Sequence, residues 1–393
     1  MALHLIAALL LGATTPARPA ERLIPPWARK YNMNCSGCHT PNVPRLNSKG
    51  YAFKWAGYRM PEEIGEDQEV KNLSDYLGTR FRFSYVWNKA QSAPATDNSF
   101  SLNDQAIFAG GPIGKNLGVF LEFAHTPDGV ELVNNLYGVW GKENQFVGAR
   151  VGQMHWLFEG GVAGFDRTTG ISDPTPLADP LTAGGSPFAF GNGQVGLEAF
   201  FVKNKNRFSV EVLNGVKSDG MGDGAGSPST KDYVVIDQLL YDTQGSGLTA
   251  VAYFGSIKGL DPAIPQTAHY QRFGLTANKR FNGFEALGGY VLGKDNDLPV
   301  GTVFTAKSVS ASGFWGYGGY TFPSTLTAFG RYEFVNSNID VANSGNIRYV
   351  AGAVMPFNLP EYLRMTLEYT LDSPRGAGGA KRHGLGLEAM LAF

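Results

Sequence analysis

The clearest structural signal in the chain is the stretch Thr79-Arg-Phe-Arg-Phe-Ser-Tyr-Val-Trp-Asn88. Its odd-numbered residues, from Thr79 to Trp87, are mostly aromatic, and its even-numbered residues, from Arg80 to Asn88, are mostly polar. This is the period of two at which side chains of a β-strand point to opposite faces. The stretch therefore predicts a strand with one apolar and one polar face.

The same alternation recurs to the end of the chain and predicts sixteen strands. They span 79–88, 100–109, 116–124, 131–141, 146–155, 194–202, 207–213, 232–242, 248–256, 268–279, 284–293, 307–320, 325–336, 346–355, 362–371 and 380–393. Connections after odd-numbered strands are long or variable, as at 156–193, and those after even-numbered strands are short, as at 281–283. An even strand count with short turns and both termini on one side is typical of a bacterial outer-membrane β-barrel.

A soluble β-propeller or β-sandwich would also contain many short strands. The predicted outward faces carry almost no charge, whereas the opposite faces carry many charged residues, which suits a polar lumen inside a lipid-facing wall. These charged residues are Arg80, Arg82, Glu122, Arg150, Glu198, Glu211, Arg272, Arg331, Glu333, Arg364, Glu368 and Glu388. Aromatic residues toward the strand ends are expected to form interfacial girdles. They are Trp87, Tyr137, Trp140, Tyr253, Trp315, Tyr317, Tyr320 and Tyr362.

The composition of the chain agrees with a membrane barrel. Of 393 residues 51 are glycine, and charged residues make up 17% against a typical ~25%. The net charge of −1 provides no basic field for nucleic acid, so nucleic-acid partners are not expected. The longest uninterrupted apolar run, Leu5–Leu11, is far shorter than the ~20 residues of a membrane-spanning helix. Helical membrane proteins are therefore excluded.

The N-terminal part of the chain differs from the rest. Residues 1–20 combine the apolar run with a small-residue exit and predict a secretory signal peptide, the alternative being a short buried helix of a cytosolic protein. Residues 21–77 contain both cysteines, two tryptophans and clustered prolines. Residues 78–393 contain the predicted strands. The sequence thus predicts a signal peptide, a small helical module and a β-barrel.

Cys35-Ser-Gly-Cys38-His39 is the C-x-x-C-H attachment sequence of c-type haem. One helical turn places both thiols where they form thioethers with one porphyrin, and His39 then reaches the iron. A redox-active cysteine pair or half of a zinc site are the alternatives. The first usually belongs to a thioredoxin-like unit and the second needs further Cys or His nearby, and residues 21–77 show neither. The motif predicts one covalent haem c.

Met60 is the expected sixth iron ligand, because its thioether is a soft ligand that raises the iron potential. It follows the helix-like stretch 50–58, whose Phe53 and Tyr58 are expected to pack on the porphyrin. Met33 lies too close to Cys35 to reach the far haem face. Met60 as a packing residue, or a barrel histidine as the ligand, are the alternatives.

Two further features concern the surroundings of the haem. Pro41 or Pro44 is expected to offer a carbonyl to the His39 ring N–H. The predicted long connections are rich in aspartate, and an acidic rim would concentrate cations such as ferrous iron. Aspartate is also a common turn residue, which is the simpler explanation. The residues are Asp97, Asp128, Asp166, Asp173, Asp179, Asp219, Asp223, Asp261, Asp295, Asp297, Asp340 and Asp372.

With these residues in place, the chain resembles the fused outer-membrane monohaem cytochrome c–porin family associated with extracellular iron oxidation. The resemblance rests on the Cys35–His39 motif and on the residues that follow it. These are Pro44, Leu46, Asn47, Gly50, Phe53, Gly57, Tyr58 and Met60. The barrel resembles that family only in architecture, through its sixteen strands and terminal Phe393. Lys49 departs from the aromatic residue usual before the glycine.

The expected fold is mainly β, a 16-stranded antiparallel transmembrane β-barrel over 78–393 with a small N-terminal helical c-type cytochrome module over 21–77 that plugs it. The resemblance implies that single electrons pass from an extracellular donor such as Fe(II) to a periplasmic c-type cytochrome, in contact with outer-membrane lipid. A diffusion porin with a periplasm-facing haem redox or sensing module is the alternative. Outward electron transfer to an extracellular acceptor is another.

Overall fold

The computed structural model describes residues 26–40, 45–91, 96–126, 129–154, 169–182, 185–191, 193–216, 230–258, 267–298, 307–358, 362–376 and 379–393. The predicted signal peptide, 1–20, lies outside these residues, as do Pro41 and Pro44. Among the described residues, no helix is both long enough and apolar enough to cross a membrane.

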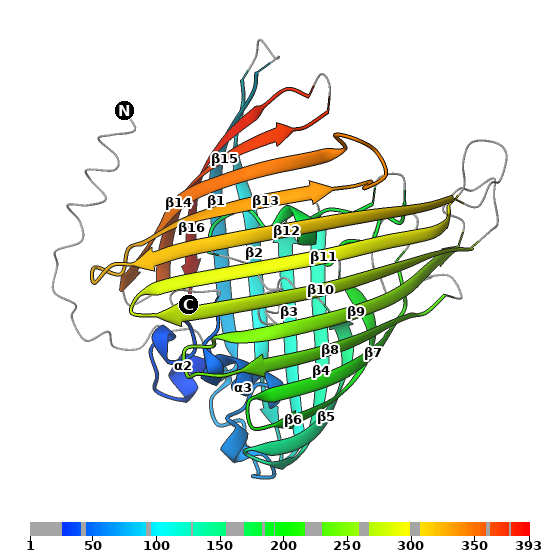
Figure 1. The fold of residues 1–393 in the computed structure, drawn as a ribbon. Coiled ribbons are helices and arrows are strands. Elements are labelled where there is room, and N and C mark those ends of the chain that lie inside the picture. The colour runs from blue at the N-terminus through cyan, green and yellow to red at the C-terminus, as the bar shows by residue number, and fades with distance from the viewer. Residues whose placement is uncertain are drawn as a thin grey trace.

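Sixteen antiparallel strands in the described part of the chain close into one barrel (Figure 1). They are β1 (Leu77–Ala90), β2 (Asp97–Ile113), β3 (Leu117–Thr126), β4 (Gly129–Lys142), β5 (Gln145–Met154), β6 (Gln194–Lys203), β7 (Asn206–Leu213), β8 (Asp232–Leu240), β9 (Gly247–Lys258), β10 (Thr267–Phe281), β11 (Phe284–Leu298), β12 (Lys307–Thr321), β13 (Thr327–Asn336), β14 (Gly345–Asn358), β15 (Tyr362–Pro374) and β16 (Arg382–Ala392). Every strand pairs with its neighbours in sequence, and β1 pairs with β16 to close the barrel. The predicted sixteen-stranded antiparallel barrel with a small helical N-terminal region is confirmed, and each predicted strand overlaps an observed one.

The barrel wall has an apolar outer surface. Along β8, buried and exposed residues alternate without exception, as the period of two requires. Large apolar side chains stand on the outer face, with Phe83 48%, Phe123 50% and Leu275 56% exposed. Soluble proteins rarely expose continuous apolar surface on this scale. The outer wall therefore faces lipid, and the propeller and sandwich alternatives are excluded.

The connections differ in length between the two ends of the barrel, as predicted. Those after even-numbered strands are short, and the β10–β11 turn consists of Asn282 and Gly283 with φ of 47° and 82°. Two residues with positive φ form the type I′ turn that suits the twist of a hairpin. At the other end, the connection between β5 and β6 runs from Met154 to Gln194. Only the β3–β4 connection, at 127–128, is unexpectedly short.

The predicted aromatic girdles are wrong for at least four of their eight members. Tyr137, Tyr253, Trp315 and Tyr317 are between 1% and 5% exposed and face the lumen, whereas Trp140 is 51% exposed. The reason is that this lumen contains protein, so aromatic side chains find apolar contacts on the inside of the wall as well. A position near a strand end therefore does not distinguish an aromatic residue that faces lipid from one that faces the lumen.

Among the described residues, two segments pack against the inner face of the wall. The first, which we call the N-terminal module, is residues 26–76, with short helices α2 (Pro26–Lys30), η2 (Cys35–Gly37), α3 (Ser48–Trp55), η3 (Pro61–Glu63) and η4 (Leu73–Asp75). Figure 1 shows α2 and α3 at the end of the barrel where the β10–β11 turn lies. Because short turns face the periplasm in such barrels, we refer to this end as the periplasmic mouth.

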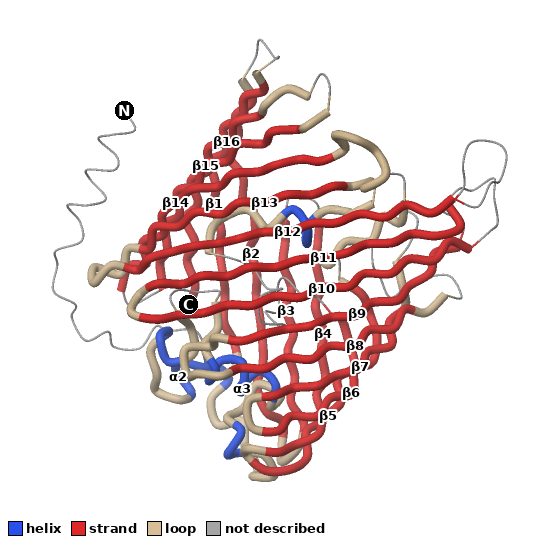
Figure 2. Tube along the Cα trace, in the orientation of Figure 1, coloured by secondary structure: helices blue, strands red, loops and turns tan. Residues whose placement is uncertain are grey.

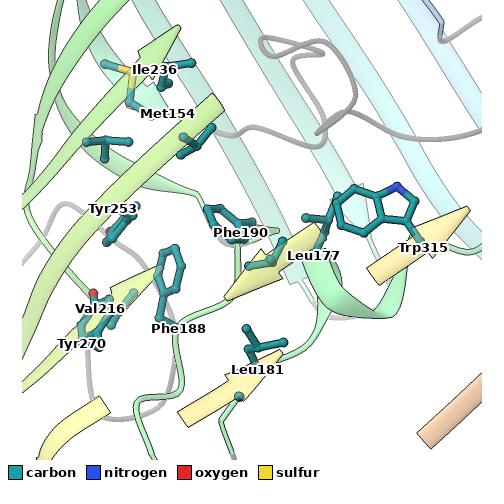
Figure 3. Packing of buried hydrophobic residues seen from close by; sticks show 14 of the residues in the cluster. Met154, Leu177, Leu181, Phe188, Phe190, Val216, Ile236, Tyr253, Tyr270 and Trp315 are labelled. Atoms are coloured by element: carbon teal, nitrogen blue, oxygen red, sulfur yellow. The ribbon is translucent and has the colours of Figure 1, made fainter. Parts of the chain in front are cut away.

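The second part, which we call the inner segment, is residues 169–182 and 185–191 of the β5–β6 connection. Its helix α5 (Thr175–Ala178) lies against β12 and β13, as Figure 2 shows. Leu177, Leu181, Phe188 and Phe190 pack on apolar wall residues such as Tyr253 and Trp315 (Figure 3). The sequence did not predict this segment, because it lacks strand or helix periodicity.

Candidate functional site

Cys35, Cys38 and His39 lie on one turn at the periplasmic mouth. The turn η2 is closed by hydrogen bonds from the backbone N–H groups of Cys38 and His39 to the carbonyl of Cys35, at 3.2 and 2.9 Å. Both cysteines are free thiols. The motif thus adopts the single turn that attachment to one porphyrin needs.

Burial raises the pKa of both the Cys35 and the Cys38 thiol above the ordinary value, although Lys49 acts in the opposite direction on Cys38. A redox-active cysteine pair instead contains a thiol of lowered pKa. Among the described residues, no three His, Cys, Asp or Glu side chains gather where a metal ion is held. The raised thiol pKa values differ from those of a redox-active pair.

His39 is oriented by a backbone carbonyl. Its Nδ1 lies 3.1 Å from the carbonyl oxygen of Arg45. Because a carbonyl only accepts hydrogen bonds, Nδ1 donates here and Nε2 remains available as an iron ligand. Pro41 and Pro44, whose carbonyls were the expected acceptors, lie outside the described residues, and the structure assigns the observed contact to Arg45.

Residues at the start of helix α3 hold the backbone of the Cys35–His39 turn. Asn47 begins the helix by accepting a hydrogen bond from the Gly50 N–H at 3.0 Å. The Asn47 amide also donates to the carbonyls of Ser36 and Gly37, at 3.3 and 3.1 Å. A Cβ at Gly50 would collide with the carbonyl oxygen of Cys38. These contacts give a physical reason for the presence of Asn47 and Gly50, two of the residues on which the resemblance rests.

The structure places Phe53, Tyr58 and Met60, each 5% exposed, in one apolar cluster between the module and the wall. We call it the mouth cluster. Its members are Tyr51, Phe53, Trp55, Ala56, Tyr58, Met60, Ile64, Phe120, Val133, Tyr137, Val139, Phe146, Phe200, Val202 and Leu240. Tyr58 stacks on Phe120 of β3, with ring centroids 4.9 Å apart. Contact of these three residues with a porphyrin, and ligation by Met60, remain predictions.

Polar contacts also join the module to the wall. The Arg59 guanidinium, in a residue that is fully buried, donates to the carbonyls of Gly114, Lys115 and Leu117 around the β2–β3 turn. The Trp27 indole N–H donates to the carbonyl of Gly110 at 2.9 Å. The module is therefore bonded to the barrel as well as packed against it.

A buried ion cluster lies where residue 45 meets the barrel wall. Arg45 Nη2 and Arg280 Nε lie 3.0 and 2.8 Å from the same carboxylate oxygen of Glu285 on β11. The three side chains are 2–3% exposed. The sequence does not predict this cluster, because Arg45 and Glu285 are 240 residues apart and neither belongs to a motif.

The charged residues predicted on the inner faces do line the lumen. Glu388, for example, lies 2.6 Å from Arg82 and 2.9 Å from Arg364. Several carboxylates hold the inner segment through its backbone: Glu368 accepts from the N–H groups of Ile171 and Ser172 at 2.8 and 3.0 Å. The lumen is therefore lined by charged side chains, and the inner segment is hydrogen-bonded to this lining.

The predicted aspartate rim is corrected in part. Asp295 is fully buried, where it pairs with Arg272 at 2.6 Å and accepts from the Ser186 N–H of the inner segment. A polar wall residue near a strand end is hard to tell from a loop residue by sequence. Asp128, Asp166, Asp219, Asp223 and Asp261 lie outside the described residues.

The residues of the mouth fit a haem c. Two reduced thiols and an oriented imidazole are the donor set that it requires. In addition, the indole N–H of Trp55, a residue 3% exposed, is buried without an acceptor among the described residues. Leaving such a donor unsatisfied costs ~1–3 kcal/mol, so an additional polar partner of the Trp55 indole would be stabilising.

Comparison with known proteins identifies the fold. No protein-family model matches the chain, and no curated protein matches it. Among solved structures, an anion-selective porin from Comamonas acidovorans is similar over 81% of this chain and 98% of its own, with TM-score 0.57 and 11% identity. Salmonella typhi OmpF in complex with daunomycin is similar over 81% and 97%, with TM-score 0.56 and 12% identity.

The outer membrane channel DcaP of Acinetobacter baumannii is similar over 84% of this chain and all of its own, with TM-score 0.53 and 11% identity. At these identities the similarity concerns the fold alone. The chain is a porin-like, closed sixteen-stranded β-barrel, and its apolar outer wall is consistent with the bacterial outer membrane.

Proposed function

We propose that this chain is an outer-membrane electron-transfer protein that carries one covalent haem c at the periplasmic mouth of a porin-like barrel. The observation that carries the proposal is the turn of Cys35, Cys38 and His39, with the His39 ring bonded to the Arg45 carbonyl. A haem attached there would supply one-electron redox chemistry.

The residues of the module have separate tasks in this proposal. Cys35 and Cys38 fix the porphyrin through thioether bonds, and His39 ligates the iron through Nε2. Met60 is the proposed sixth ligand, and Phe53 and Tyr58 supply apolar surface that excludes water. Burial in the mouth cluster supports these roles, since a water-poor, apolar setting is one of the means by which a protein tunes an iron potential.

The position of the module bears on the route of the electron. A hydrocarbon layer of ~30 Å is longer than one porphyrin, and the module lies at one mouth of the barrel. We therefore propose that an extracellular donor small enough to enter the lumen, such as Fe(II), gives its electron inside the barrel. The charged lumen wall suits an aqueous cation better than an apolar molecule.

The module has an exposed acidic surface for the periplasmic partner. Glu62, Glu66, Asp67 and Glu69 are exposed beside the buried part of the module. Opposite charges on two partners increase the rate of encounter. A soluble c-type cytochrome with basic residues around its haem edge is thus the proposed acceptor. The relation to the fused cytochrome–porin family is part of the same proposal.

A second candidate function is a diffusion porin whose haem is a periplasmic redox or sensing module. The observation in its favour is that the structural neighbours are porins and that the module lies at one mouth. Outward electron transfer to an extracellular acceptor would use the same residues with the opposite direction of flow.

Haem attachment is tested on the exported, purified chain by a pyridine haemochrome spectrum and a denaturing gel stained for haem. We expect about one haem per chain, resistant to denaturation, and its loss in Cys35→Ala/Cys38→Ala. Ser36→Ala, on the same turn, is the matched control and retains haem. Colourless wild-type protein from a host that matures c-type cytochromes would contradict the proposal.

A further inference from the structure

Arg45 bonds to two different parts of the molecule. Its backbone carbonyl accepts from His39 Nδ1 at 3.1 Å, and its guanidinium donates to Glu285 through Nε and Nη2 at 3.3 and 3.0 Å. One residue therefore joins the ring of the iron-ligand histidine to a carboxylate of the barrel wall.

The wall holds the next residue too. Arg280 Nη1 donates to the carbonyls of Leu46 and Gln244, at 2.7 and 2.6 Å, while its Nε donates to Glu285. Gly245, with φ of 83°, leaves room for this approach, because a Cβ there would lie 2.8 Å from the Leu46 carbonyl oxygen. The β8–β9 and β10–β11 turns thus fix the backbone that follows the haem motif.

Burial of this cluster is costly. Transferring charged groups from water into a protein interior carries a penalty of several kcal/mol per ion, and an apolar contact would hold the module as well. A hydrogen-bonded ion pair additionally fixes the orientation of the module relative to the barrel wall. Hydrogen-bond partners of the second ring nitrogen orient a ligating histidine and set its basicity. Their loss typically lowers metal affinity or activity ~10- to 100-fold.

We propose that Arg45 and Glu285 are positioning residues for the haem, so that the barrel wall sets the orientation and donor strength of His39. This rests on the proposed function. It implies that the module alone is an incomplete cytochrome, and that the iron potential depends on a wall residue of β11.

The test compares Glu285→Gln with Glu388→Gln in the full haem-containing chain. Glu388 is the matched control, because it too lies between two buried arginines, Arg82 and Arg364, but on β16, whereas Glu285 lies on β11. The readouts are the midpoint potential from a redox titration and the low-spin ferric electron paramagnetic resonance spectrum, which reports the axial ligands.

We expect Glu285→Gln to raise the midpoint potential, because a less basic histidine and one fewer nearby negative charge both favour the ferrous iron. A roughly tenfold change in the ferric-to-ferrous ratio at fixed potential corresponds to 59 mV. The resonance spectrum should change as well. Glu285→Asp should have the wild-type midpoint potential and resonance spectrum, and so should Glu388→Gln.

A wild-type potential and spectrum in haem-containing Glu285→Gln would overturn the inference, as would an equal shift in Glu388→Gln. If Glu285→Gln does not accumulate, Arg45→Lys decides, since lysine keeps the charge but not the paired donors. It should alter the resonance spectrum, and an unaltered spectrum overturns the inference. Wild-type protein without haem would instead overturn the proposed function.

Discussion

Asp242 stabilises the turn on which helix α3 rests. It lies between β8 and β9, and its carboxylate accepts from the N–H groups of Gln244 and Ser246 at 3.0 and 2.9 Å and pairs with Lys279 at 3.0 Å. The Asp242 carbonyl accepts from the Ser48 hydroxyl at the start of α3. Partial burial acts to raise the carboxyl pKa, but the hydrogen bonds from Ser246 and Lys279 outweigh it and lower the pKa to about 2.

This lowered pKa predicts a pH dependence of stability. The unfolded carboxyl titrates near ~3.9, so the stabilisation is complete above that pH and is lost as the pH falls toward 2. We expect Asp242→Asn to lower the melting temperature by ~1–2 °C at pH 7, a small shift because the carboxylate is only partly buried and solvent screens its contacts. Thermal unfolding in detergent from pH 7 to pH 2 measures the difference. A difference that persists unchanged at pH 2 would contradict this assignment.

Some residues of the candidate site could be predicted from the sequence and others could not. Cys35, Cys38 and His39 could be proposed as a haem-attachment site, because attachment chemistry demands a fixed local spacing; the proposal stays a prediction. The Arg45 carbonyl could not, since any residue offers a carbonyl and only the folded loop selects one. Arg45 and Glu285 were beyond prediction for a further reason: two ordinary charged residues far apart in sequence carry no sign that they meet.

At the scale of elements, the strands were predictable and the inner segment was not. A wall strand contacts lipid on one face and the lumen on the other, so its sequence alternates whatever its neighbours are. The inner segment instead takes its conformation from scattered wall residues. Leu177 and Phe188 give it apolar contacts, and Glu333, Glu368 and Asp295 bond its backbone N–H groups.

The bonding of the inner segment predicts a local effect of Glu368→Gln. A hydrogen bond to a charged group contributes ~1.5–3 kcal/mol, which corresponds to about tenfold or more in an opening equilibrium. The amide protons of Ile171 and Ser172 should exchange faster by that factor in hydrogen–deuterium exchange. Ser186, bonded to Asp295 in the same segment, is the internal control. Equal acceleration at Ser186, or none at Ile171, would show that Glu368 does not hold the segment locally.

For the whole molecule, the barrel and the module depend on one another unequally. The ring of strand pairs closes without any contribution from the N-terminal module. The module, in contrast, packs much of its apolar surface on β3, β4 and β6. We infer that the barrel folds without the module, whereas the module needs the barrel.

Deletion of residues 26–76 should therefore leave a folded barrel with a wider passage. We expect single-channel conductance in planar bilayers to rise, since a sixteen-stranded barrel encloses an aqueous channel, although the inner segment still narrows it. Heat-modifiable migration on a gel checks that the deleted chain is folded. Equal conductance of the two proteins would favour the diffusion porin, in which the module leaves the passage open.

The central claim is that one haem at the periplasmic mouth accepts electrons from the far side of the membrane. The most direct measurement uses proteoliposomes that enclose oxidised soluble cytochrome c and carry the haem-loaded chain in the outside-out orientation. On addition of external Fe(II), we predict reduction of the enclosed cytochrome, and none with the Cys35→Ala/Cys38→Ala chain. If the enclosed cytochrome stays oxidised with the haem-loaded wild type, the claim is contradicted.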